Sequence, residues 1–245
     1  MSLSQPLLWK RRILAVLLFG TAFGYMEAAV VSYLRDLDEP VVQRFYPGRP
    51  PGDLFPLLTQ GQVAAVEPQG RRMLVIEIGR EAATILMLAG IALAASTNMG
   101  AWAAAFAIAF GTWDITFYVF LKVLLDWPAS LFTWDILFLI PVPWVGPVIA
   151  PVLVSAAMIA AGIWHLRREA DGNPVRLGRW NWAGLAAGAA VIIVAFTLDY
   201  ANVMAGGMPR PFHWAVFAMG LGIGVFSYAG AVVRKEMRRE QAVTA

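Results

Sequence analysis

The sequence contains no cysteine and only two histidines, His165 and His213, in 245 residues. The absence of cysteine excludes disulfide bonds, thiolate catalysis, Cys-ligated iron–sulfur clusters and Cys-bound zinc. The two histidines fall near opposite ends of predicted helices, so they cannot both ligate one haem iron. We therefore expect no haem and no iron–sulfur cluster. We also expect no nucleotide, because the chain has neither a Walker loop nor a dinucleotide-binding glycine motif.

Charged residues are also scarce. They make up 14% of the chain, against about a quarter in soluble domains, while hydrophobic residues make up 59%. Several apolar runs reach the roughly 20 residues that a helix needs to cross a bilayer. The composition therefore predicts an all-α integral membrane protein. Its formal charge of +3 comes from basic residues that flank the apolar runs. Such residues are typical of topology signals, so we expect the lipid bilayer as a partner and no nucleic acid.

The apolar runs predict a bundle of about six transmembrane helices in a single membrane domain, residues 13–233. The predicted spans are 13–34, 73–95, 101–125, 144–166, 182–203 and 212–233. Residues 1–12 would form a cytoplasmic N-terminus, 36–72 a long outer loop and 234–245 a cytoplasmic tail. Lysine and arginine are more frequent beside the predicted inner ends, which favours both termini in the cytoplasm. We expect the bacterial inner (plasma) membrane as the location.

Prolines interrupt the apolar stretch 127–151. Because proline lacks a backbone donor and clashes with the preceding helical turn, one continuous helix is not expected there. The pattern predicts a short interfacial or re-entrant helix near residues 130–139, a break at Pro141 to Pro143, and then the fourth span. Elsewhere, glycines recur four residues apart, which predicts close helix packing inside the bundle, at Gly20/Gly24, Gly184/Gly188 and Gly220/Gly224.

The most informative feature is a set of ionisable residues inside predicted spans. Each costs about 2.5–3.5 kcal/mol at the centre of a membrane helix, so a functional site is the first hypothesis. Helical spacing places the set in the outer half of the bundle, where it comprises Glu27, Glu77, Arg80, Glu81 and Asp114. Tyr118 and Lys122 share a helix face with Asp114, and we expect Asp135, Asp199 and His213 at the rim.

Charge balance suggests what this polar site could hold. Four acids face one arginine, Arg80, which leaves an excess of three negative charges. Carboxylates that lie close together in low dielectric cannot all stay ionised without compensation, so the site should hold protons, a cation or a partner's basic group. The competing interpretation is that Arg80 and one or two glutamates form an ion pair that locks helices together.

A short repeat also involves this site. The tetrapeptide Thr-Trp-Asp-Ile occurs at 112–115 and again at 133–136. Either the repeat is a coincidence or Asp114 and Asp135 have a paired role.

Three functions remain open from the sequence. The best hypothesis is a cation- or proton-coupled transporter or binding protein with a carboxylate site that faces the outer side. The alternatives are an intramembrane enzyme that acts on a lipid or isoprenoid, and a non-catalytic subunit of a larger membrane complex. Possible partners are accordingly a cation, a lipid or other membrane subunits. No nucleophile elbow and no metalloprotease motif is present, so no catalytic residue and no metal ligand can be named.

Overall fold

The computed structural model describes residues 5–50, 52–66 and 69–244. The remaining residues of the predicted N-terminus, outer loop and tail lie outside the described part, namely 1–4, 51, 67–68 and 245. The long elements are all helices, as the sequence predicts. Five of them, α1, α4, α5, α6 and α8, supply segments long and apolar enough to cross a membrane. These five helices indicate a membrane location.

The elements follow one another along the chain as eight helices and one small hairpin in the described residues. They are α1 (Gln5–Phe45), α2 (Gln60–Ala65), α3 (Gln69–Ala94), α4 (Met99–Leu125), β1 (Trp134–Phe138), β2 (Trp144–Pro147), α5 (Ile149–Ala170), α6 (Arg179–Thr197), α7 (Tyr200–Met204) and α8 (Trp214–Thr244).

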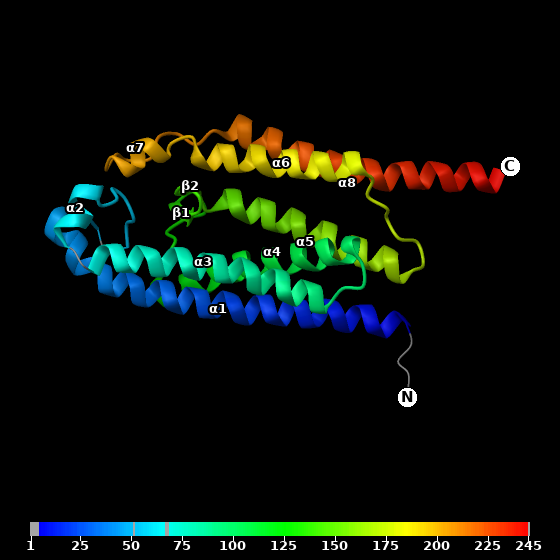
Figure 1. Ribbon diagram of the computed structural model, residues 1–245, viewed down its shortest axis with the longest axis horizontal. Coiled ribbons are helices and arrows are strands. Elements are labelled where there is room, and N and C mark those ends of the chain that lie inside the picture. The colour runs from blue at the N-terminus through cyan, green and yellow to red at the C-terminus, as the bar shows by residue number, and fades with distance from the viewer. Residues whose placement is uncertain (1–4, 51, 67–68, 245) are drawn as a thin grey trace.

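The long helices run roughly parallel to one axis and form two groups (Figure 1). In the first group α4 packs against α1, α3 and α5, and in the second α6 packs against α8. The hairpin, α2 and α7 lie toward one end of the molecule. Helix α1 begins and α8 ends at the opposite end, together with the α3–α4 turn and the α5–α6 loop.

Small residues set the distances between helices in both groups. A Cβ on Gly24 of α1 would lie 3.0 Å from the Trp113 carbonyl oxygen of α4. A Cβ on Gly188 of α6 would lie 2.8 Å from the Gly220 carbonyl oxygen of α8. These approaches are too short for any larger residue, so the predicted glycine-mediated packing inside the bundle is confirmed at these positions.

The segment between α4 and α5 is not helical, but its form differs from the one predicted. Residues 134–138 and 144–147 pair as an antiparallel hairpin, with Trp134 opposite Pro147 and Ile136 opposite Val145. The short helix expected near 130–139 is therefore wrong. Trp, Ile and Phe favour strands, and Pro141 and Pro143 fall in the connecting turn, where no ladder hydrogen bond is lost.

Several predicted boundaries also differ. Helix α5 begins at Ile149 rather than near 144, with Pro151 in its first turn, where a missing N–H is tolerated. Helix α1 continues from the predicted end at 34 to Phe45, which shortens the expected 36–72 loop, and α8 continues through the predicted tail. The apolar run ends where the bilayer ends, but a polar sequence can keep the helical conformation beyond it.

Candidate functional site

A buried cavity of about 80 Å³ lies where α1, α3, α4 and the hairpin meet. Four carboxylates and one guanidinium contribute to its wall, together with four aromatic rings. The residues that line it are Glu27, Val31, Arg80, Glu81, Thr84, Trp113, Asp114, Phe117, Tyr118, Asp135, Ile136, Leu137 and Phe138. The structure thus brings Glu27, Arg80, Glu81, Asp114 and Tyr118 of the predicted set to one space. Asp135, which was expected at the rim, lies inside.

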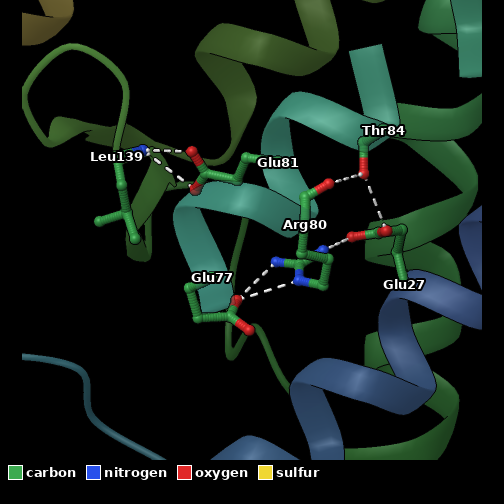
Figure 2. Close-up of polar contacts among 6 residues, drawn as sticks. All are labelled: Glu27, Glu77, Arg80, Glu81, Thr84 and Leu139. Atoms are coloured by element: carbon green, nitrogen blue, oxygen red, sulfur yellow. Dashed lines mark hydrogen bonds and ion pairs between the residues drawn. The ribbon is translucent and has the colours of Figure 1, made fainter. Parts of the chain in front are cut away.

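Arg80 is the centre of an ion-pair cluster that joins α1 to α3 (Figure 2). Its Nε and Nη2 donate to Glu77 Oε2 at 3.0 and 2.9 Å, as the three-residue spacing on α3 allows. Its Nη1 pairs with Glu27 Oε2 on α1. The hydroxyl of Thr84 donates to the other oxygen of Glu27 at 3.0 Å. This arrangement agrees with the helix-locking interpretation for Glu27, Glu77 and Arg80.

Glu81 hydrogen-bonds to the hairpin, whereas its neighbour Arg80 pairs with Glu27 and Glu77. Both of its carboxylate oxygens accept the backbone N–H of Leu139, at 3.0 and 2.9 Å (Figure 2). Leu139 directly follows β1, so its N–H has no partner strand to pair with. An unpaired backbone donor is costly even where it is only partly buried, as here. Glu81 therefore ties the end of the hairpin to α3.

Asp114 is the most isolated acid of the cavity. Its side chain is only 8% exposed, and Oδ2 accepts a hydrogen bond of 2.8 Å from the Ser155 hydroxyl of α5. Gly111, one turn earlier on α4, permits this contact, because a Cβ there would lie 2.5 Å from the Ser155 carbonyl oxygen. Within the described residues Asp114 forms no ion pair.

Asp135 lies on β1, outside the helices that could span the membrane. Its Oδ2 accepts the Tyr118 hydroxyl at 2.8 Å, and both side chains are buried. Burial raises the pKa of Asp135 to about 6, although Arg35 and the Tyr118 hydrogen bond act in the opposite direction. Because Tyr118 follows Asp114 by one helical turn, the two aspartates of the Thr-Trp-Asp-Ile repeat face the same cavity.

Arg35 is a neighbour of the cavity residue Asp135, and the sequence analysis did not identify it. Its guanidinium lies over the Trp127 ring, 4.0 Å from the ring centroid, and acts electrostatically on Asp135. Its Nε and Nη1 have no hydrogen-bond partner among the described residues. Arg35 falls between the predicted span 13–34 and the predicted loop 36–72, so it was not considered as part of a helix face. The missed signal is spacing, since Glu27, Val31 and Arg35 recur every four residues on one helix face.

Two hydroxyl residues, Thr84 and Ser155, were also missed, because neither carries a charge that would mark it in an apolar run. Trp113 lines the cavity as well, and its buried indole N–H has no hydrogen-bond partner in the described part of the chain. A buried donor without a hydrogen-bond partner is uncommon in folded proteins.

The other predicted residues lie elsewhere. Lys122 pairs with the exposed Asp126 at 2.7 Å and donates to the Pro128 carbonyl, so it does not enter the cavity. Asp199 accepts the backbone N–H of Arg210 at 2.8 Å, and His213 is exposed. Asp199 and His213 belong to the α6–α8 connection, which does not form the rim of this cavity.

The charge excess remains when the neighbours are included. With Glu77 and Arg35 added to the lining residues, five acids face two arginines, again an excess of three negative charges. Among the described residues, no three His, Asp or Glu side chains are arranged so that they could hold one metal ion. Comparison with protein-family models, with curated proteins and with solved structures gave no match.

Proposed function

We propose that this protein is a membrane carrier or receptor that holds a proton or a small cation in the carboxylate cavity. The observation that carries the proposal is Asp114, which is buried, has one hydroxyl partner and forms no ion pair with any described residue. An isolated ionised carboxylate cannot be kept in such a place without compensation. Asp114 therefore takes a proton or a cation at neutral pH.

The size of the cavity supports this class of ligand. A cavity needs a volume of roughly 10–15 Å³ to hold one water molecule. The cavity volume of about 80 Å³ therefore accommodates several waters or one small cation. A lipid or isoprenoid chain does not fit, which makes the enzyme hypothesis the weaker one. The rings of Trp113, Phe117 and Phe138 line the same cavity, and aromatic faces attract cations. A small ammonium ion is therefore a candidate besides the proton and the alkali-metal ions.

The proposal includes six spans with both termini in the cytoplasm of a bacterial cell. Helix α3 is the sixth span, because its 26 residues extend about 39 Å and it lies beside α1 in the bundle. Glu77, Arg80 and Glu81 lower its apolar character, but their partners lie inside the protein. An even number of crossings also fits the start of α1 and the end of α8, which share one end of the molecule.

The absence of natural cysteine makes a topology test simple. Two exposed acids, Asp53 and Asp171, lie in connections at opposite ends of the bundle. We expect an impermeant thiol reagent to label Asp53→Cys in intact cells and to label Asp171→Cys only after lysis. Labelling of Asp171→Cys from outside would refute the orientation.

The central experiment measures proton release. Purified protein in weakly buffered detergent is mixed with Na⁺, K⁺ or methylammonium, and a pH indicator reports released protons. We expect one of the three ions to displace a proton from the wild type, and Asp114→Asn to abolish the signal while it still folds. Asp126→Asn is the matched control, because it removes an exposed acid at the end of the same helix, outside the cavity. No release or binding heat with any ion, or equal loss in the control, would overturn the proposal.

A further inference from the structure

A second cavity, of about 530 Å³, lies at the other end of the molecule from the carboxylate cavity. Its volume falls within the range of small-molecule sites. It is an open cleft bordered by the start of α4, the end of α5 and the α5–α6 connection. The residues that line it are Asn98, Met99, Gly100, His165, Glu169, Pro174, Val175, Arg176, Leu177 and Trp182.

The start of α4 presents free backbone donors to this cavity. Asn98 caps the helix, and its Oδ1 accepts the Ala101 N–H at 2.9 Å. Met99 and Gly100 come before Ala101 in the first turn of the helix. No acceptor for their backbone N–H groups occurs among the described residues. Such donors, together with the positive end of the helix dipole, favour anions.

His165 provides a second, independent indication of a ligand. The side chain is only 4% exposed and lines the cavity, but it makes no hydrogen bond within the described residues. Its Nε2 lies beside the start of α4, 3.0 Å from the position of a Cβ on Gly100. Its ring nitrogens are not among the fully buried unpaired atoms of the described residues, so they can donate to or accept from a ligand in this cleft. A ligand between His165 and the start of α4 would supply such a partner.

The charges around the cavity indicate the kind of ligand. Arg176 brings a guanidinium from the α5–α6 connection, and guanidinium groups bind phosphate oxygens through paired hydrogen bonds. Glu169 is the one carboxylate in the lining, and its Oε1 already accepts the Asn98 side-chain amide at 2.6 Å. Trp182 also lines this cavity. Tryptophan is common where membrane helices leave the bilayer.

We propose that this cavity binds a phosphate group through Arg176, His165 and the first N–H groups of α4. The phosphate belongs either to a phospholipid headgroup or to a free phosphate in solution, since both offer the same oxygens. The site is distinct from the carboxylate cavity and does not depend on its function.

Binding to the full-length protein in maltoside detergent tests this proposal. The two probes are a short-chain phosphatidylglycerol and inorganic phosphate, and native mass spectrometry or calorimetry gives apparent Kd values. We expect Arg176→Gln to weaken binding of the preferred probe by about tenfold, the usual effect of losing a charged hydrogen bond. Arg176 is exposed, so the variant should fold. Arg179→Gln is the matched control, because Arg179 carries the same charge nearby but lies over Trp180 outside the cavity.

A third variant tests the sign of the ligand's charge. Glu169→Gln removes a repulsive charge and should tighten phosphate binding, whereas it would weaken the binding of a cation. Tight binding of phosphatidylglycerol with weak binding of phosphate identifies the lipid as the source, and equal binding identifies the free ion. Equal losses in Arg176→Gln and Arg179→Gln, weaker binding in Glu169→Gln, or no binding of either probe would each refute the proposal.

Discussion

The two groups of helices are held together by different means. Helices α1, α3, α4 and α5 and the hairpin share buried ion pairs and charged hydrogen bonds, such as Arg80 with Glu27. Helices α6 and α8 meet at Gly188 and Gly220, and their most conspicuous polar link is the Asn181 amide to the Ser227 carbonyl at 2.6 Å. These two helices therefore pack through small residues without any buried ion pair among the described residues. The buried charges of the other group provide a second means of joining helices.

The largest effect expected from this comparison is that of Arg80→Gln. The variant leaves Glu27 and Glu77 without their cation, and breaking a buried pair by removing one partner costs about 3–5 kcal/mol. We expect a severe loss of folded protein, measured by size-exclusion chromatography and thermal unfolding in detergent. Adding Glu27→Gln should restore part of the stability, because it removes one uncompensated charge. No restoration by the double variant would contradict the ion-pair account.

The next largest effect is a pH dependence of the folding stability that is caused by Asp135. Burial raises its pKa to about 6 from the ordinary 3.8, so the folded protein holds this proton more tightly than the unfolded chain. The resulting stability is fully present below pH ~4 and is lost as the pH rises through about 6. At about 1.4 kcal/mol per pKa unit, the loss is about 3 kcal/mol.

Asp135→Asn isolates the contribution of Asp135 to the pH dependence of stability, because the other acids titrate in both the variant and the wild type. The amide oxygen can still accept the Tyr118 hydroxyl, so the variant should keep the fold. We expect the difference in unfolding temperature between variant and wild type to grow in the variant's favour from pH ~4 to ~7. A difference that is constant with pH would show that Asp135 does not titrate there.

The sequence predicted those features that depend on composition and helical spacing. The long apolar helices follow from the scarcity of charge, and the convergence of Glu27, Glu81 and Asp114 follows from their similar depth. The hairpin was not predictable in the same way, because an apolar stretch rich in proline does not distinguish strand from short helix. Its end is held by Glu81, a contact between residues far apart in the sequence. Arg35 was missed because hydropathy marks the end of the bilayer and not the end of α1.

A smaller effect, confined to the second group of helices, is expected from Gly188→Ala. The new Cβ would lie 2.8 Å from the Gly220 carbonyl oxygen and the Gly224 nitrogen, so α6 and α8 must move apart. Overpacking of this kind costs about 1–3 kcal/mol. Gly222→Ala on α8 is the matched control, because its Cβ has ordinary space. We expect a lower unfolding temperature for Gly188→Ala alone, with proton release by the carboxylate cavity unchanged. Altered proton release would show that the two groups are coupled.

The smallest effect on stability should come from Glu81→Gln, because the side chain keeps a carbonyl oxygen that can accept the Leu139 N–H. Glu81→Leu has a similar size but no acceptor, and it leaves a partly buried backbone donor unpaired at a cost of about 1 kcal/mol or more. If Glu81 serves only to hold the hairpin, Glu81→Gln should unfold within a few tenths of a kcal/mol of wild type and release protons normally. If its charge also belongs to the cavity, Glu81→Gln should keep the stability and lose or weaken cation-driven proton release. Thermal unfolding and the pH-indicator assay on the two variants therefore separate the structural role of this carboxylate from its electrostatic one. Equal destabilisation by glutamine and leucine would mean that the hydrogen bond to Leu139 does not hold the hairpin in place.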